Sequence, residues 1–315
     1  MHGTIRAVLA VILTVIVAVG VGVAIERRSN AAAHRVRQLA LQTMLWALVP
    51  FVAYVNVARL QLSVDAGLSI AVGGAAFLAG GALMALLGRG PLALERPVAG
   101  AAIVATVQAN TAYLGLPLCA ALFTHAEFTQ AVAFDALISL PMFAFGSYSV
   151  GAMYGHAPRT GVWSRVRAAL TRNPVLPSLI AGLLVPNAWA PHALVTPSKV
   201  AVFALLPLGF LIVGVTLADE AKDGTLRVPP PLTAPVTAVI GLRMLLPVAV
   251  LALADALGLD VPAPFLLLAA MPTGLNTLVV AHATGLDLRL VATSIVWTTT
   301  LVLPVVAVLD VTGVL

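Results

Sequence analysis

Charged residues are scarce in this chain: 9% of its 315 residues, against about 25% in soluble domains. So few charged residues are not enough to cover a water-exposed surface. The composition therefore excludes an ordinary soluble enzyme, a disordered protein and a nucleic-acid-binding protein. The single cysteine, Cys119, excludes a disulfide framework, and no Cys/His cluster has metal-site spacing. We therefore predict no metal and no cofactor. With 61% hydrophobic residues and a mean hydropathy of +1.05, the chain is predicted to be a polytopic membrane protein.

Long apolar stretches fill the sequence, and a helix needs roughly 20 such residues to cross a bilayer core. The first stretch, Ala7 to Ile25, is longer than the apolar region of a signal peptide, and Glu26-Arg27-Arg28 follows it. We therefore interpret it as the first membrane span rather than as a cleaved leader. The ten predicted spans lie near 4–26, 39–62, 66–88, 98–123, 129–155, 174–193, 198–219, 232–257, 261–284 and 288–312.

Basic residues are distributed unequally between the two sides of the predicted membrane. Loops after odd-numbered spans carry 13 of them, whereas the opposite side carries only Arg6, Arg59 and Lys199. The positive-inside rule therefore places both termini outside the cell membrane. Between spans five and six, the basic segment 156–172 is predicted to be a cytoplasmic linker. It suits a short helix on the membrane surface, and a solvated loop fits equally well.

Three prolines of the first half have counterparts five spans later in the chain. The pairs are Pro50 with Pro207, Pro117 with Pro272, and Pro141 with Pro304, at offsets of 157, 155 and 163 residues. Because five is odd, the second copy enters the membrane upside down, which is a common construction in secondary transporters. We therefore predict an inverted repeat, with residues 1–155 as the first half and 173–315 as the second.

The middles of spans four and nine both combine proline with glycine, asparagine and threonine. The two segments are 110–117 and 272–277. Proline and glycine weaken a helix there, so each span is predicted to break and to restart with Pro117 or Pro272 near its first position. Free N–H groups and the positive end of the helix dipole then favour an anion such as a carboxylate. The alternative is a pair of merely kinked helices.

These two segments resemble a known family. Asn110-Thr111-Ala112-Tyr113-Leu114-Gly115-Leu116-Pro117-Leu118 is similar to the NTGxxGLPL signature of the auxin efflux carriers, and Ala270-Met271-Pro272-Thr273-Gly274-Leu275-Asn276 is similar to their AMPxxxN signature. The resemblance implies an all-α fold of ten transmembrane helices in two inverted repeats, shared with bile-acid and sodium/proton carriers, in which spans four and nine cross. It also implies transport of small organic acids. Ala112 departs from the family pattern, which has glycine there, and the short central linker indicates a prokaryotic carrier.

The predicted substrate-binding residues come from the two motifs. They are Asn110, Thr111, Tyr113, Gly115, Pro117, Pro272, Thr273, Gly274 and Asn276.

Two ionisable residues inside predicted spans are further candidates. Asp135, early in span five, either carries a proton from a buried position or caps its helix near the outer surface. Arg243, in span eight, either attracts the substrate anion or extends toward the cytoplasmic side, and the second interpretation is the simpler one. Counted from opposite ends of their spans, Asp135 and Arg243 lie at different depths, so we do not predict an ion pair. Gln108 and Asn56 are polar residues that helix-to-helix hydrogen bonds explain equally well.

Together these features predict a secondary transporter or uniporter of a small organic anion, and not an enzyme. Spans three to five and eight to ten are predicted to move against spans one, two, six and seven. The predicted partners are the substrate anion, the lipid bilayer and a coupling proton, with a homodimer left open. The alternatives are a sodium-coupled carrier of the bile-acid type, an intramembrane enzyme and a receptor. The substrate, the coupling ion and the direction of transport stay open.

Overall fold

A computed structural model describes residues 2–59, 63–156, 174–222 and 230–311. Within these ranges the chain is helical, and its only β-type pairing is an isolated bridge between Ala109 and Thr273. The predicted cytoplasmic linker 156–172 lies, apart from His156, outside the described residues.

Six helical runs are long and apolar enough to cross a membrane, as judged by their length and composition. They are Leu9–Arg28, Asn30–Ala58, Val64–Arg89, His192–Asp219, Ala234–Ala256 and Leu288–Val308. They coincide with predicted spans one, two, three, seven, eight and ten. Predicted spans four and nine are split by non-helical breaks, and the α-helix of predicted span six, Val175–Leu184, is ten residues long. The chain is therefore a helical membrane protein, with six long apolar helices and several shorter ones in its described part.

In chain order the main elements are α1 (His2–Arg28), α2 (Asn30–Thr43), η1 (Met44–Leu48), α3 (Val49–Ala58), α4 (Val64–Arg89), α5 (Arg96–Val107), η2 (Thr111–Gly115), α6 (Leu116–Leu122), α7 (His125–Phe134), η3 (Asp135–Ser139), η4 (Met142–Ser147), α8 (Tyr148–Tyr154), α10 (Val175–Leu184), η5 (Asn187–Trp189), η6 (His192–Leu194), α11 (Val195–Lys222), α12 (Ala234–Ile240), η7 (Gly241–Leu245), α13 (Leu246–Ala256), α14 (Ala263–Ala269), α15 (Asn276–Thr284) and α16 (Leu288–Val311). Here η1, η2, η3, η4 and η7 are π-helical turns, whereas η5 and η6 are 3₁₀-helical.

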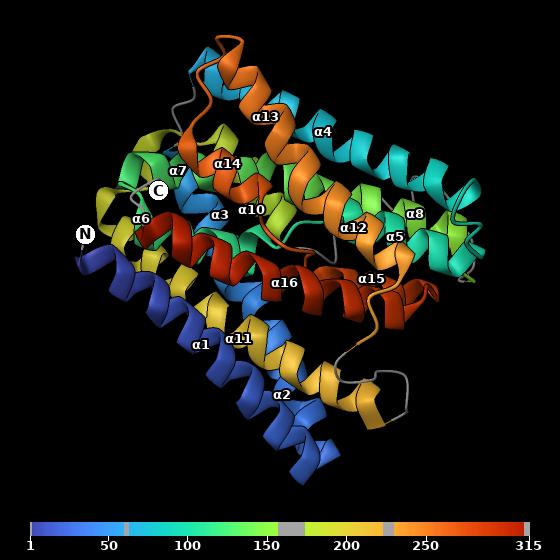
Figure 1. Ribbon diagram of the computed structural model, residues 1–315. Coiled ribbons are helices and arrows are strands. Elements are labelled where there is room, and N and C mark those ends of the chain that lie inside the picture. Colours follow the sequence, from blue (N-terminus) through green and yellow to red (C-terminus); the bar gives the residue numbers. More distant parts are fainter. Residues whose placement is uncertain (1, 60–62, 157–173, 223–229, 312–315) are drawn as a thin grey trace.

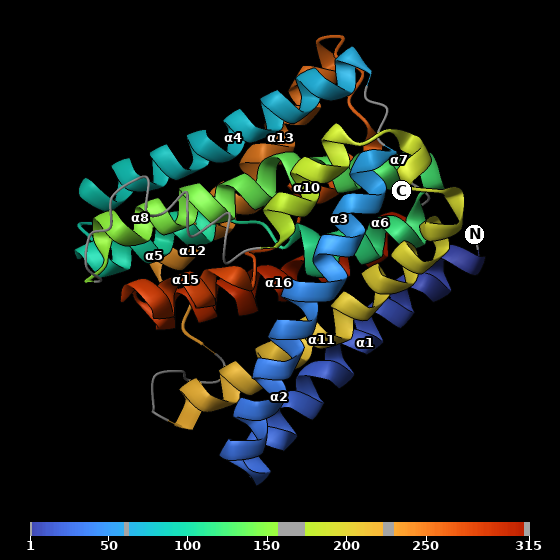
Figure 2. The same cartoon turned by 180° about the vertical axis from the view of Figure 1, so that it is seen from behind.

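The helices form two groups that lie against each other (Figures 1 and 2). In one group α1 and α2 pack on α11, and α3 packs on α10. In the other group α4 packs on α5 and α13, while α16 packs on α5 and α12. The α1–α11 contact is close because glycines replace side chains there: a Cβ on Gly22 would lie 2.3 Å from the carbonyl oxygen of Leu211. We call these groups the scaffold (α1, α2, η1, α3, α10, α11) and the core bundle (α4–α8, α12–α16).

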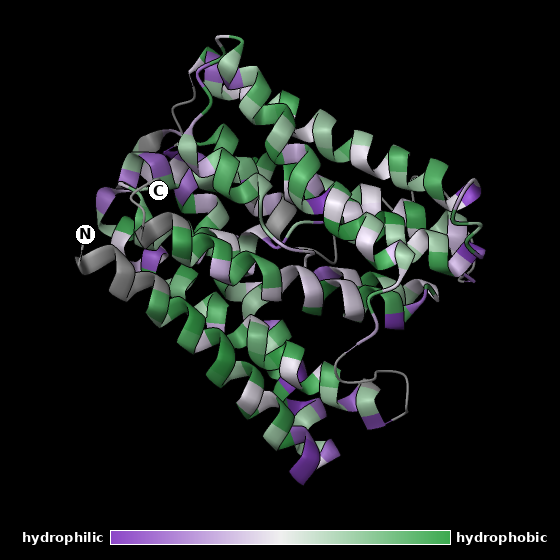
Figure 3. Cartoon of the chain, in the orientation of Figure 1, coloured by the Kyte–Doolittle hydropathy of each residue, from purple (hydrophilic) through white to green (hydrophobic). Residues whose placement is uncertain are grey.

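Apolar residues cover the lengths of the helices, whereas hydrophilic residues gather near their ends (Figure 3). On α1, five large apolar side chains are exposed: Leu9, Leu13, Ile16, Val17 and Val21. A continuous exposed apolar face of this kind is suited to contact with lipid.

The predicted helix restarts differ from the observed ones. Pro117 lies in the first turn of α6, but α6 continues without interruption from η2, so the N-terminus of this helix is at Thr111. Pro272 lies within the second break, four residues before α15 begins at Asn276. The prediction was wrong because a π-helical turn precedes Pro117, and the wider turn tolerates the missing N–H without ending the helix.

Candidate functional site: the crossing of two broken helices

The two breaks meet and pair through their backbones. The Asn110 N–H donates to the carbonyl of Pro272 at 2.7 Å, and the Gly274 N–H donates to the carbonyl of Gln108 at 2.8 Å. These bonds satisfy backbone groups that the breaks leave without helical partners, which is the condition for non-helical backbone within a membrane protein. We call residues 108–110 and 272–275 the crossing.

Small and hydroxylated side chains hold the crossing together. A Cβ on Gly274 would lie 2.8 Å from the carbonyl oxygen of Ala109, so only glycine allows this approach. The Thr273 hydroxyl donates to the carbonyl of Ala105 at the end of α5, and the Thr273 N–H donates to the Thr298 hydroxyl on α16. Gly115 packs tightly against Leu268. Of these residues, Thr273 and Gly115 contribute only to packing, whereas Gly274 also lines the cavity described next.

A small cavity lies beside the crossing, with a volume of about 20 Å³, which is room for about one water molecule. It is lined by Gln108, Ala109, Asn110, Thr111, Ala112, Tyr113, Asp135, Ser139, Leu140, Phe143, Gly274, Leu275 and Asn276. The first residues of both restarted helices are therefore at its wall. The first amides of the Thr111 helix have no intrahelical acceptor, whereas the amides of Thr277 and Leu278 bond to the carbonyls of Gly274 and Leu275.

Asn110 is the unusual residue of this cavity. Its side chain is 1% exposed, and neither its Nδ2 nor its Oδ1 has a hydrogen-bond partner among the described residues. Asn276, the first residue of α15 after the second break, accepts a hydrogen bond from the Tyr113 hydroxyl at 3.0 Å. Buried amide groups are normally bonded, so the free amide of Asn110 indicates a place for a polar ligand or water.

Asp135 lies at the same cavity, which decides between its two predicted positions in favour of the buried one. Its side chain is 5% exposed, and its Oδ1 lies 2.5 Å from the Thr111 hydroxyl. The Thr111 hydroxyl also lies 2.8 Å from Ser139 Oγ. Thr111 begins its helix, so the carboxylate is placed next to the positive end of that helix dipole.

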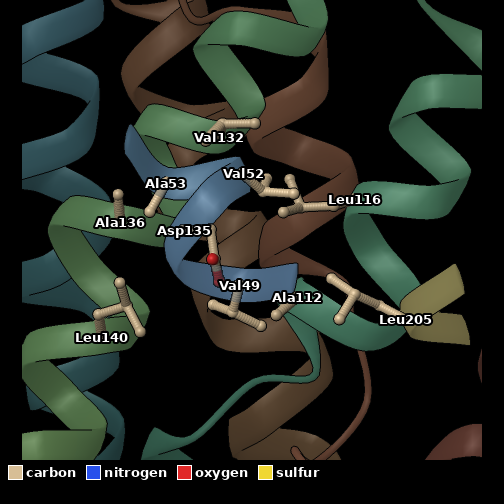
Figure 4. Close-up of a pocket in the computed structure, with 10 residues that line it drawn as sticks. All are labelled: Val49, Val52, Ala53, Ala112, Leu116, Val132, Asp135, Ala136, Leu140 and Leu205. Atoms are coloured by element: carbon tan, nitrogen blue, oxygen red, sulfur yellow. The ribbon is translucent and has the colours of Figure 1, made fainter. Parts of the chain in front are cut away.

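A second, smaller cavity of about 10 Å³ lies between the scaffold and the core bundle, and Asp135 lines it too. Figure 4 shows the Asp135 side chain among apolar residues, with Val49, Val52 and Ala53 on α3 and Leu205 on α11 opposite Ala112. Asp135 is thus the one acidic residue among those lining either cavity. It faces both the crossing and the boundary between the two helix groups.

Arg243 corrects a prediction. It does not extend toward the surface: its side chain is fully buried, and the guanidinium lies 4.3 Å from the centre of the Phe77 ring. It donates to carbonyls at the C-terminal ends of both broken helices, namely Ala269 at 2.5 Å and Met271 at 3.2 Å after α14, with a longer contact of 3.4 Å to Thr106 on α5. The surface interpretation was wrong because these carbonyls, which the breaks leave without helical donors, attract a buried cation.

The structure brings most of the predicted residues together but divides their roles. Five of the nine motif residues line the crossing cavity: Asn110, Thr111, Tyr113, Gly274 and Asn276. The other four, Gly115, Pro117, Pro272 and Thr273, contribute packing or backbone geometry instead. Ser139 and Phe143 are lining residues that sequence reasoning missed. Asp135 and Ser139 are four residues apart, which is a helical spacing that would have found Ser139 once Asp135 was chosen.

The predicted polar candidates outside the motifs are also placed. The Asn56 side chain donates to the Ser198 hydroxyl at 2.7 Å and so joins α3 to α11, as the helix-to-helix interpretation expects. Gln108 belongs to the crossing itself.

Comparison with protein-family models finds no match for this chain, and comparison with curated proteins finds none either. The likeness to the auxin efflux carriers thus stays a resemblance based on the two motifs.

Proposed function

We propose that this protein is a secondary transporter or uniporter of a small organic anion, which binds at the crossing and is exposed to either side of the membrane in turn. The observation that carries the proposal is the buried amide of Asn110, which has no hydrogen-bond partner within the described part of the chain and lies at a cavity lined by the first residues of two restarted helices. An amide donor and helix N-termini are groups that bind a carboxylate. The residues that line the cavity include a carboxylate and hydroxyls but no histidine, lysine or cysteine, so we favour transport over an intramembrane enzyme.

The packing pattern supports two inverted repeats of five spans. Span one (α1) of the first half packs on span seven (α11) of the second half. Correspondingly, span six (α10) of the second half packs on span two (α3) of the first half. Likewise α5 of span four packs on α16 of span ten, whereas α14 of span nine packs on α7 of span five. Each contact therefore has a counterpart with the two halves exchanged, as an internal two-fold symmetry requires.

The division into scaffold and core bundle supports alternating access. A cavity for about one water molecule has no room for an organic anion, so substrate binding requires the walls to separate. The apolar cavity between α3, α11 and the start of span five lies on the boundary where such a movement takes place. Asp135 faces this boundary, so its environment changes when the core bundle moves.

Asn110→Ala tests the site. Because the Asn110 side chain has no hydrogen-bond partner to lose among the described residues, we expect its removal to leave the melting temperature nearly unchanged. We expect substrate affinity to fall about 10- to 100-fold, the usual effect of losing a hydrogen bond to a charged group. The measurement is a thermal-shift titration of purified protein with mono- and dicarboxylates, with and without sodium.

Asn56→Ala is the matched control for Asn110→Ala. Asn56 is also a buried asparagine, but it bonds to Ser198 across the scaffold, so its loss should lower the melting temperature and spare the affinity. Misfolding as the main effect of Asn110→Ala would place the site elsewhere. A response to substrate that requires sodium would favour the sodium-coupled alternative.

Membrane topology is a separate prediction of the ten-span arrangement. We expect reporter fusions in the basic loops to report the cytoplasm and fusions on the other side to report the outside. The cytoplasmic fusion points are Arg28, Arg89, Arg165 and Arg227, and the outside points are Glu127 and Lys199. A cytoplasmic C-terminus would contradict the arrangement.

A further inference from the structure

Four basic residues lie near one another, where α3 ends and where α7, η6 and α11 begin. They are Arg59 after α3, His125 at the start of α7, His192 in η6 and Lys199 on α11. The rings of His125 and His192 are 6.3 Å apart, and Lys199 Nζ lies 5.8 Å from the centre of the Phe128 ring. Arg59 donates to the carbonyl of Ala190, two residues before His192, at 2.8 Å. We call these four residues the basic cluster.

The basic cluster lacks a compensating carboxylate among the residues that the structure describes. Every charged group that acts on His125 is itself basic: Lys199, His192 and Arg59. The nearest acidic residue along α7, Glu127, uses its carboxylate to cap that helix, by accepting from the Thr124 N–H at 2.9 Å and from the Thr124 hydroxyl at 2.6 Å. Like charges that are held together repel each other, so a bound anion would stabilise the cluster.

One ring nitrogen of the cluster is without a partner. His125 Nδ1 is buried and makes no hydrogen bond to any described residue, while the ring as a whole is half-buried. A buried ring nitrogen that is protonated needs an acceptor, which an anionic ligand provides.

The cluster is connected to the crossing through a helix. The helix that starts at Thr111 ends at Leu122, and His125 follows after a short turn. At 1.5 Å per residue, its far end is about 17 Å from the crossing cavity. Arg59 and Lys199, by contrast, belong to the scaffold.

We propose that the basic cluster is an outer anion-collecting site, which binds the carboxylate substrate before it reaches the crossing. This inference rests on the proposed function. Positive charge that lines a route raises the local concentration of an anion and its rate of association, and the effect falls with ionic strength. Since Arg59 and Lys199 lie on the scaffold and His125 on the core bundle, the anion is collected at the boundary that opens.

The cluster makes this step depend on pH. Burial lowers the pKa of His125, with Lys199, His192 and Arg59 adding to the effect, so the ring is disfavoured as a cation in the absence of an anion. A bound anion favours the protonated ring. The affinity of the cluster for an anion should therefore rise as pH falls. The charged groups that face His125 are Arg59, His192 and Lys199, whereas the Glu127 carboxylate is engaged in capping α7.

The test uses the double variant Lys199→Gln/His192→Gln, because Arg59 and His125 have packing roles at helix ends. Right-side-out membrane vesicles containing the wild type or the variant are given malonate or propionate at pH 7.5 and pH 5.5. We expect the KM for external malonate to rise by at least about threefold in the variant, with Vmax unchanged. The rise should be smaller for propionate, which has one charge, and should shrink at high salt.

The matched control removes two positive charges at the opposite end of the molecule. Arg27→Gln/Arg28→Gln alters the last turn of α1, where both side chains are exposed, and should leave the KM for external malonate unchanged. In inside-out vesicles the cluster variant should behave as the wild type does.

Two outcomes overturn the proposal. A KM that is unchanged in the cluster variant, while the wild type transports malonate, removes the collecting site and leaves the proposed function intact. A KM change found only in proteoliposomes of phosphatidylglycerol, and absent in phosphatidylcholine, assigns the cluster to a lipid headgroup instead. Wild-type protein that takes up neither malonate nor propionate overturns the collection of these two anions, whereas the proposed function is decided separately by the thermal-shift titration of Asn110→Ala.

Discussion

Replacing Asp135 with asparagine is expected to abolish transport driven by a pH gradient while sparing substrate exchange. Asp135 is buried beside the crossing cavity, with Thr111 within hydrogen-bond distance. An ionised carboxylate there would repel a substrate anion, so binding the anion favours the protonated acid. Substrate and proton then bind together and leave together. Asparagine has nearly the same shape and stays neutral, so it resembles the protonated form in both conformations.

The expected effect has an upper bound set by thermodynamics. When a monocarboxylate crosses with one proton, a gradient of one pH unit supports about a tenfold substrate gradient, because both correspond to about 1.4 kcal/mol. Proteoliposomes with an imposed pH gradient should approach this limit with the wild type and show no accumulation with Asp135→Asn. Counterflow, measured with substrate loaded inside, needs no net proton movement and should persist.

Asp65→Asn is the matched control for this experiment, since it removes the same charge from an exposed position in the first turn of α4. Accumulation driven by the pH gradient that survives in Asp135→Asn would remove the proton from the proposal. So would wild-type flux that is indifferent to the gradient. A uniporter, driven by the substrate gradient and the membrane potential, would then be the better interpretation.

Much of the helical arrangement could be read from the sequence because apolar length and proline pattern reflect local physics. The long runs predicted near 66–88 and 198–219 correspond to α4 (Val64–Arg89) and α11 (Val195–Lys222) within a few residues. The breaks in spans four and nine were also found, since glycine and proline weaken helices wherever they stand. The residues at which the helices restart were predicted wrongly. In span four a π-helical turn precedes Pro117 without a break, so the helix begins at Thr111.

The partners of individual side chains depend on tertiary packing, which one sequence does not record. Thr273 and Asn276 belong to one motif, yet Thr273 bonds to Ala105 and only Asn276 lines the cavity. The sequence supported a buried and a near-surface position for Asp135 equally, because the burial of this side chain depends on how α7 packs. Arg243 was placed wrongly for the same reason: its acceptors are more than 20 residues away in the chain.

Replacing Arg243 with methionine is expected to have the largest effect on stability. The side chain is fully buried, and its loss leaves the carbonyls of Ala269, Met271 and Thr106 without this donor. Each buried acceptor left unsatisfied costs about 1–3 kcal/mol, so we expect a loss of more than about 3 kcal/mol and a clear fall in melting temperature. Arg89→Met, at an exposed arginine that bonds to Tyr154, should change the stability by less than about 0.5 kcal/mol.

Arg243→Lys separates the charge of Arg243 from its geometry. Lysine keeps the positive charge near the two helix C-termini but has no planar fork to reach carbonyls of both broken helices at once. If Arg243 holds the crossing in place, Arg243→Lys should have a higher melting temperature than Arg243→Met. Its substrate affinity should still be lower than that of the wild type. Full recovery of affinity by lysine would mean that only the charge matters. An unchanged melting temperature in Arg243→Met would contradict the assigned contacts.

Each of the two buried charged residues lies at a helix end of opposite sign. Asp135 lies at a positive N-terminus, and Arg243 lies at negative C-termini. Losing Arg243 should therefore destabilise the crossing, whereas neutralising Asp135 should change mainly the proton coupling.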